Sequence, residues 1–376
     1  MDFNLTEERM MLRDTLQRFL ADKYSHENRR ALIAAGKPFD SGIYAGLADL
    51  GVLGAMFRED QGGFGGEGFD LMVVFEELGR AGVIEPVLPA VLAGGLIAAF
   101  GTGRQRGLAD EIIAGTHVAA LAQGEAGSRY DLNHVETTAA ADGDAIVLNG
   151  IKTHVLYGAE AQTLVVSARE AGAAADMAGI SLFLVPANTP GVTVSGHRNM
   201  DGIPSATVAL DGVRLAGTAR LGAAGGGLEA LEAAVARGLA SLCAEALGAM
   251  EAAKDLTIAY LKERKQFGMP IGKFQALQHR MADMLIEVEQ ARSAVINLAG
   301  NLDQPRELRE IHVSAAKNLI GRAGALVAEE CIQMHGGIGM TDEYALSHFA
   351  RRLTMIDHLF GDTDYHLERF IALKAG

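Results

Sequence analysis

The segment Asp142-Gly-Asp-Ala-Ile-Val-Leu-Asn-Gly150 places a β-branched apolar run between two dipeptides that favour tight turns. Asp-Gly and Asn-Gly supply the positive φ angles that short hairpins need. Further short runs of the same kind occur at 163–166, 180–185, 192–194 and 206–210, and the last is followed by Asp211-Gly212. We therefore predict a small antiparallel β domain over residues 117–219.

The residues before this region have helical periodicity. Thr6 precedes Glu7 and Glu8, which is a first-turn signal for a helix. A second helix is predicted at about 69–80, after a glycine-rich stretch. The apolar segment 83–100 contains glycine and proline and is too short to span a bilayer, so we expect a buried helix.

The residues after the β region return to long helical patterns. Two apolar faces are expected, formed by Leu231, Val235, Leu239 and Leu242, and by Leu277, Met281, Met284, Leu285 and Val288. Broad faces of this kind are typical of an antiparallel bundle that associates with other subunits. The predicted fold is mainly α with a central β domain: a helical domain at 1–116, the β domain at 117–219, and a helical bundle at 220–376.

Composition excludes several classes of protein. The chain has 376 residues, 49% of them hydrophobic, and 33 Lys plus Arg against 47 Asp plus Glu give a net charge of −14. This acidic balance argues against a general nucleic-acid binder, and two cysteines provide no disulfide scaffold. We find neither a signal peptide nor a membrane span in the sequence, so a cytoplasmic protein is expected.

Three motifs are better explained as ordinary structure. Gly63-Phe-Gly-Gly-Glu-Gly68 matches a dinucleotide fingerprint, but no buried strand precedes it. His335-Gly-Gly337 resembles an esterase oxyanion hole, but the chain has no G-x-S-x-G sequence. His358, Asp362 and His366 have the spacing of metal ligands, but Gly361 interrupts the helix they would need, so we predict no metal.

Two other segments combine groups that recognise a nucleotide. Arg264-Lys-Gln-Phe-Gly268, followed by Phe274-Gln275, offers a guanidinium for phosphate and aromatic surface for a flat ring. Gln333-Met-His-Gly-Gly337 is a glycine turn that ends a helix, and its backbone amides are open to an anion.

Together with Glu125-Ala-Gly-Ser128 and the closing segment 351–363, these motifs resemble the acyl-CoA dehydrogenase family over essentially the whole chain. The resemblance implies an oligomer that binds FAD at a subunit interface. It also implies oxidation of the Cα–Cβ bond of an acyl-CoA thioester, with electrons passed to an electron-transfer flavoprotein. A carboxylate base, donors for the thioester oxygen and polar contacts to the flavin ring are then required.

By this resemblance, the catalytic base is missing. The family usually carries Glu-Gly-Thr where this chain has Phe360-Gly361-Asp362. Some members place the glutamate on an earlier helix, at the position of Gly238. Asp362 and Glu245 remain as carboxylates near these two positions.

The contacts to the flavin ring are altered as well. Ala122 replaces a hydroxyl residue, and His154-Val-Leu-Tyr157 replaces a Trp-Ile-Thr-Asn run that shields and hydrogen-bonds the ring. By contrast, the residues that reach the ADP part of an FAD held mainly by a neighbouring subunit are retained: Arg264, Gln266, Phe267, Phe274, Gln333, Gly336 and Gly337. Ser128 is the candidate contact to the substrate CoA.

This asymmetry indicates a companion subunit in an α₂β₂ acyl-CoA dehydrogenase of lipid or steroid catabolism. It resembles the small subunit of pimeloyl-CoA and steroid-CoA enzymes, and the partner subunit would carry the glutamate. Two alternatives stay open: a self-sufficient homomeric dehydrogenase with Asp362 as a relocated base, and a non-catalytic CoA-ester binding or scaffold protein.

Overall fold

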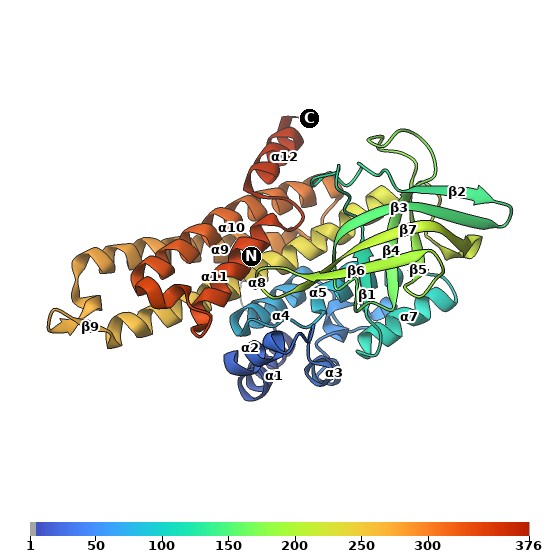
Figure 1. Ribbon diagram of the computed structural model, residues 1–376. Coiled ribbons are helices and arrows are strands. Elements are labelled where there is room, and N and C mark those ends of the chain that lie inside the picture. Colours follow the sequence, from blue (N-terminus) through green and yellow to red (C-terminus); the bar gives the residue numbers. More distant parts are fainter. Residues whose placement is uncertain (1–4, 376) are drawn as a thin grey trace. The chain divides into compact units, whose positions relative to one another are not determined.

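The computed structural model describes residues 5–375 and confirms the predicted order of helices, β-sheet and helices (Figure 1). The chain forms two compact units, which are described separately. Unit 1 holds the chain up to Ala31, Glu67–Val83 and everything from Leu239 onward; unit 2 holds Leu32–Gly66 and Ile84–Gly238. The domain boundaries expected near residues 116 and 219 stay a prediction, because the compact units divide the chain elsewhere.

The core of unit 2 is an eight-stranded sheet with the order β6-β7-β3-β2-β4-β5-β8, and β1 is paired to β4. The strands are β1 (Ala119–Ala122), β2 (Thr138–Asp142), β3 (Ala145–Leu156), β4 (Thr163–Arg169), β5 (Ile180–Pro186), β6 (Val192–Arg198), β7 (Pro204–Ala216) and β8 (Arg220–Leu221). Most pairs are antiparallel, as predicted, but β4 runs parallel to β1 and meets the first residue of β2 in a parallel contact, so the sheet is mixed.

Only one of the three predicted tight turns is a hairpin. Gly143, with φ +61°, lies in the turn between β2 and β3. Asn149-Gly150 and Asp211-Gly212 instead lie inside β3 and β7, where the pairing register shifts. The Asn149 Oδ1 atom accepts the Gly212 N–H at 2.8 Å, so these two pairs form an irregularity that bends two long strands.

A buried ion pair lies inside this sheet. The Lys152 ammonium donates to Glu125 Oε1 at 2.6 Å and to Ser167 Oγ at 3.0 Å, and its side chain is fully buried. The Glu125 carboxylate also accepts the backbone N–H groups of Glu136 and Thr137. Burial lowers the pKa of Lys152 to about 8, although Glu125 opposes this shift.

Helices of unit 2 precede and cover the strands. They are α3 (Ser41–Asp49), the short helices η1 (Gly54–Met56) and η2 (Glu59–Gln61), α5 (Val87–Pro89), the π-helical turn η3 (Ala90–Gly94), α6 (Gly95–Phe100) and α7 (Arg104–Ile113); η4 (Gly217–Ala219) precedes β8. The helix predicted from residue 83 is buried, as expected, but begins only at Val87. Pro86 explains this start, because a proline disfavours the helical conformation of the residue before it.

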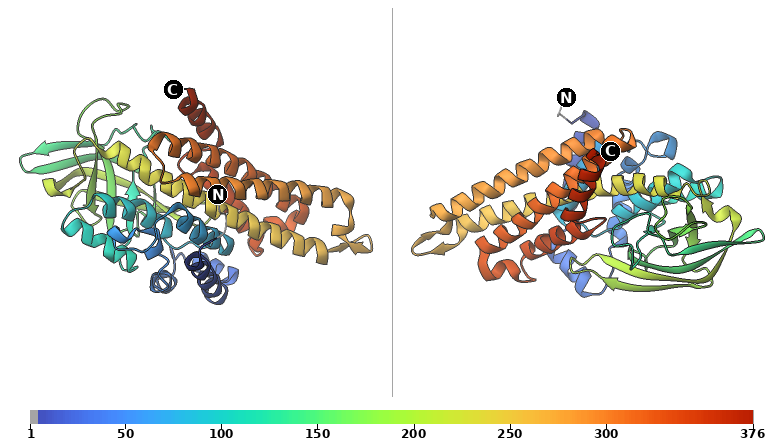
Figure 2. Two further views of the ribbon diagram at one scale, coloured as in Figure 1. Left: turned by 180° about the vertical axis from the view of Figure 1, so that it is seen from behind. Right: turned by 90° about the horizontal axis from the view of Figure 1, so that it is seen from above.

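Unit 1 is a helical bundle. Its helices are α1 (Glu7–Lys23), the start of α2 (His26–Ala34), α4 (Gly68–Ala81), α8 (Gly227–Glu263, from Leu239), α9 (Gln275–Asn301), α10 (Arg306–His335), the short η6 (Gly336–Met340), α11 (Ala345–His358) and α12 (Thr363–Ala375). Helix α10 packs against α9, α11 and α12, and the pairs α9–α10 and α10–α11 lie side by side in both views of Figure 2. As predicted, Thr6 caps α1, with its Oγ1 accepting the Arg9 N–H.

The long helix α8 is apolar by composition. Within the described chain it is the one helix long and apolar enough to cross a membrane, and 89% of its most apolar window is buried inside the fold. This degree of burial is typical of a core helix. On α9, Met281, Met284 and Val288 are buried as predicted, whereas Leu285 is 37% exposed and was wrongly assigned to the core face.

Replacing Lys152 by Met tests the buried ion pair. The Glu125 carboxylate then stays buried without its counter-charge, so we expect the free energy of unfolding to fall by about 3–5 kcal/mol. The double variant Glu125→Gln/Lys152→Met removes both charges but keeps a side-chain oxygen that can accept a backbone N–H, so it should regain part of this loss. Urea denaturation followed by circular dichroism measures both, with the exposed Lys273→Met as control. A double variant no more stable than the single one would contradict this account.

Candidate functional site

The first nucleotide-type motif forms the tip between α8 and α9. Strands β9 (Lys265–Gln266) and β10 (Met269–Pro270) pair as a small hairpin, and η5 (Ile271–Lys273) leads into α9 (Figure 1). Phe267 and Gly268 make the turn with φ angles of +53° and +79°, and the Phe267 side chain is 89% exposed. The rings of Phe267 and Phe274 meet edge to face at 6.1 Å. The hairpin therefore presents Arg264, Gln266 and Phe267 to solvent.

The second motif forms the end of α10. His335 closes the helix, and Gly336 follows with φ +68° and ψ −148°, a conformation open to glycine. Gln333, Gly336 and Gly337 are exposed. A Cβ added at either glycine would meet no atom within 4 Å, so their backbone is unobstructed.

The structure brings these two segments together within unit 1. The ring of Tyr260, in the last turn of α8, stacks on the ring of His335 with centroids 4.4 Å apart and an interplanar angle of 24°. The Tyr260 carbonyl also accepts the N–H of Arg264 at 2.8 Å. The motifs at Arg264 and Gln333 are about 70 residues apart in the sequence. The contact between α8 and α10 at Tyr260 and His335 brings them close together.

These residues fit the diphosphate and adenosine part of FAD. No hydrogen bond or ion pair engages the Arg264 guanidinium among the described residues, so this fork donor is available for phosphate. The exposed glycine backbone and the exposed Phe267 ring lie on the same pair of helix ends. Arg264, Gln266, Phe267, Phe274, Gln333, Gly336 and Gly337 would hold this part of the cofactor.

The flavin-ring segments of unit 2 do not offer the same fit. Ala122 lies buried on β1, and Leu156, at the end of β3, is 8% exposed; neither side chain has a polar atom. His154 has φ +53°, is exposed, and meets the ring of His197 at 6.1 Å. Tyr157 is buried, and its hydroxyl donates to the Ile84 carbonyl, which makes it an internal anchor.

Ser128 has a structural role in the same unit. Its hydroxyl donates to the Glu125 carbonyl at 2.9 Å and accepts the Glu125 N–H at 3.1 Å, and the residue is 4% exposed. The hydroxyl closes a turn and points inward. The prediction that Ser128 contacts CoA therefore gains no support from this geometry.

The usual base position lies in a tightly held loop of unit 1. Phe360 has φ +56°, and its carbonyl accepts a hydrogen bond from His366 Nε2 at 3.2 Å. The buried Lys317 ammonium donates to the carbonyls of Gly361 and Asp357. Burial, followed by the charge of Lys317, lowers the pKa of His366 to about 3, so this ring stays neutral. None of these groups presents a carboxylate at position 360.

The other candidate carboxylates have structural partners. The Asp362 carboxylate accepts the Tyr365 N–H at 2.9 Å and so caps α12. Glu245 and Arg352 form a buried bidentate ion pair at 2.6 and 2.8 Å. At Gly238, an added Cβ would lie 2.5 Å from the buried Leu92 side chain, so a glutamate does not fit there without repacking.

Backbone strain marks the same segments. In the part of the chain that the structure describes, the non-glycine residues with positive φ are Arg129, His154, Tyr157, Phe267 and Phe360. Each lies in, or directly beside, a motif that the sequence analysis singled out. Such conformations cost about 1–3 kcal/mol each and persist where the surroundings fix them. The surrounding fold thus fixes the backbone of these segments.

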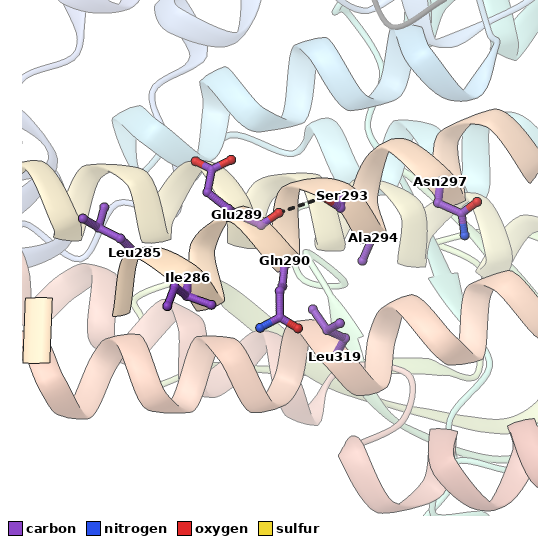
Figure 3. A pocket seen from close by; sticks show the side chains of 8 residues that line it. All are labelled: Leu285, Ile286, Glu289, Gln290, Ser293, Ala294, Asn297 and Leu319. Carbon is purple, nitrogen blue, oxygen red and sulfur yellow. Dashed lines mark hydrogen bonds between the residues drawn. The ribbon is translucent and has the colours of Figure 1, made fainter. Parts of the chain in front are cut away.

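A shallow groove on the surface of unit 1 lies apart from these motifs (Figure 3). It measures about 670 Å³ and is lined by Leu285, Ile286, Glu289, Gln290, Ser293, Ala294, Asn297 and Leu319, all on α9 except the last. Its walls pair no nucleophile with a base. Among residues 5–375, no group of three or more His, Cys, Asp or Glu side chains is placed to hold a metal ion.

Sequence reasoning missed the residues that join the motifs. Tyr260 and Tyr344 contact His335, yet neither belongs to a motif. The sequence offered one signal for Tyr260: it lies four residues, about one helical turn, before Arg264 and so on the same helix face. The Lys152–Glu125 pair was also missed, because no local pattern connects the two residues.

Replacing Gly336 by Ala tests the glycine turn. The backbone there has φ +68° and ψ −148°, a region that residues with a Cβ avoid. We expect the free energy of unfolding to fall by about 1–3 kcal/mol. Gly337→Ala is the matched control, since its neighbourhood is equally open and its φ is not positive. Equal losses in thermal denaturation for the two variants would show that conformation is not the reason for glycine at 336.

Comparison with known proteins matches the three parts of one family along the chain. Residues 6–108, 120–213 and 225–372 match the N-terminal, middle and C-terminal domains of acyl-CoA dehydrogenases. Glutaryl-CoA dehydrogenase of Desulfococcus multivorans is 30% identical over 370 residues, which cover 93% of this chain and 92% of that protein.

Solved structures give the same result. In the ChsE4-ChsE5 complex from Mycobacterium tuberculosis, a chain of 27% identity superimposes with a TM-score of 0.90 and covers 100% of this chain and 99% of its own. A chain from a variant of the steroid acyl-CoA dehydrogenase Tcur3481-Tcur3483 is 30% identical with a TM-score of 0.87 and covers 98% of each chain. The likeness in sequence and fold thus extends over the full described chain, which belongs to the acyl-CoA dehydrogenase family of FAD-dependent oxidoreductases acting on acyl-CoA.

Proposed function

We propose that this chain is the companion subunit of a heteromeric acyl-CoA dehydrogenase, in an α₂β₂ assembly. It contributes the residues of its α8–α10 end to an FAD that is seated mainly in a second, base-bearing subunit. That second subunit carries the catalytic glutamate and completes the oxidation of the acyl-CoA.

One observation carries this proposal: the two halves of a flavin site differ in this chain. The nucleotide half, around Arg264 and Gly336, keeps an available guanidinium and open backbone. The ring half, around Ala122 and Leu156, has lost its polar side-chain atoms. A hydrogen bond to a charged phosphate contributes about 1.5–3 kcal/mol to binding. The retained nucleotide half can therefore still stabilise a bound FAD.

The absence of an available base supports the same conclusion. Phe360 and Gly238 occupy the two usual positions, and both Glu245 and Asp362 have internal partners. Loss of a general base costs about 10²–10⁴ in rate. Bound FAD supplies hydride acceptance, but abstraction of the α-proton needs a carboxylate that this chain does not present at either position.

Two similar structures support a heteromeric assembly by their names. One is described as a ChsE4-ChsE5 complex and the other as the steroid dehydrogenase Tcur3481-Tcur3483. From the second name we carry over a CoA thioester of the lipid or steroid class as substrate. A similar solved chain comes from a structure described as an electron-transferring flavoprotein of Acidaminococcus fermentans, which supports such a flavoprotein as electron acceptor. The cytoplasmic location is proposed from the sequence alone.

The homomeric alternative would require Asp362 to act as the base. Its carboxylate instead caps α12 through the Tyr365 N–H, which disfavours that role. The alternative of a CoA-ester scaffold without flavin does not account for the nucleotide half, whose residues would then bind no cofactor.

Counting flavins tests the proposal. The chain is purified alone and after co-expression with a second dehydrogenase from an adjacent reading frame, chosen because it has a glutamate at either base position. We expect no bound flavin alone and one flavin per pair of chains in the complex. A yellow isolated chain that bleaches with an acyl-CoA would refute the companion role.

Arg264→Ala tests the retained half-site in the assembled complex. Because a charge-assisted contact to phosphate is lost, we expect flavin to dissociate about 10- to 100-fold more readily. Lys262→Ala, on an exposed residue of the last turn of α8, is the control. Equal flavin retention by both variants in ultrafiltration would argue against the assigned contact.

Phe360→Glu tests whether the base is the only missing part. We expect the isolated variant to remain inactive, because Ala122, His154 and Leu156 still differ in side-chain type from the residues that contact the flavin ring in the family. Turnover is followed with an acyl-CoA and an artificial electron acceptor. Robust activity from this single change would show that the ring half of the site is functional.

A further inference from the structure

His335 lies at the point where the two nucleotide-type segments meet, although it was not assigned a role in either. It is the last residue of α10 and is 5% exposed. The Tyr260 ring stacks on it at 4.4 Å, and the Tyr344 ring lies 5.2 Å away. Tyr344 follows the glycine turn, so His335 contacts the segments on both sides of the site.

The hydrogen bonds of His335 fix its tautomer. Nδ1 lies 2.8 Å from the Cys331 carbonyl, which accepts only, so Nδ1 carries the hydrogen. Burial lowers the pKa of His335 and keeps the ring neutral. Nε2 therefore accepts the Tyr344 hydroxyl hydrogen at 3.2 Å. Phenylalanine could stack in this place but could make neither of these bonds.

These contacts connect directly to the groups that would hold phosphate. The carbonyl of Tyr260 accepts the N–H of Arg264 at the end of α8, so Arg264 follows the stacked tyrosine by one helical turn. On the other side, the backbone of Gly339 folds over His335: a Cβ at Gly339 would lie 3.0 Å from the Cβ of His335. The His335 ring thus contacts Tyr260, one helical turn before Arg264, and Tyr344, which follows the glycine turn.

We propose that His335 is a positioning residue, which sets the spacing between the Arg264 hairpin and the turn at Gly336 and Gly337. This inference rests on the proposed function, because the spacing matters for a diphosphate that both segments contact. A guanidinium and a pair of backbone amides held at a fixed separation lose less conformational entropy on binding than two independent segments.

The first experiment measures the spacing in the chain itself, without flavin. Met269→Cys on the hairpin and Met340→Cys beside the glycine turn are exposed positions for two spin labels. Cys243 and Cys331 are buried and should stay unlabelled. We expect a narrow distance distribution with His335 and a clearly broadened one with His335→Ala. An unchanged distribution in His335→Ala would overturn the proposal.

The second experiment measures flavin dissociation from the complex with the base-bearing partner. We expect about a tenfold faster loss with His335→Ala, and a loss between that and the wild type with His335→Phe and Tyr344→Phe, which remove hydrogen bonds but keep a ring. Leu298→Ala, a buried residue of α9, is the control for general destabilisation. It should lower the melting temperature as much as His335→Ala does and leave flavin loss unchanged. If Leu298→Ala accelerated flavin loss equally, His335 would be merely structural.

The two experiments separate this inference from the proposed function. If the isolated chain is yellow and bleaches with an acyl-CoA, the companion role fails, while the spin-label distances still decide whether His335 sets the spacing. If Arg264→Ala weakens flavin binding and His335→Ala does not, the positioning role fails and the companion role stands.

Discussion

The contact between Tyr260 and His335 is the constraint on which the nucleotide half-site depends. It joins the end of α8 to the end of α10, and both motifs begin within one helical turn of it. The long helices supply rigid supports, since their buried faces fix each axis in the bundle. What remains is the relative position of two exposed loops, which we propose is set by the stacking of Tyr260 on the buried His335 ring.

The chain has changed its side chains more than its backbone. Positive φ angles persist at His154 and Phe360, where the family resemblance implies a ring contact and a catalytic base. Strain of this kind is maintained by the surrounding fold, for example by Lys317 and His366 around the loop at 360. Under the proposed companion role, the subunit keeps the shape of the family without the polar atoms that perform the reaction.

Burial explains why two carboxylates near the sequence motifs are held by opposite charges. A carboxylate removed from water is retained when an opposite charge or backbone donors compensate it. Glu125 has Lys152, and Glu245 has Arg352. Abstraction of a proton by either residue would first require breaking its pair. These groups stabilise the two units, and their charge is not available to a substrate.

The sequence alone determined the class of fold, the family, and the asymmetry between retained and altered motifs, because these depend on local periodicity and on the identity of residues at short spacing. Tertiary structure decided the rest. Asn149-Gly150 is typical of a hairpin turn, but pairing with a second long strand makes it a mid-strand irregularity. The internal partners of Glu245, Asp362 and Ser128 were invisible in the sequence, and the roles predicted for these residues stay predictions. The contact between residues 260 and 335 was likewise invisible, because a short-range pattern carries no information about which distant helix ends lie together.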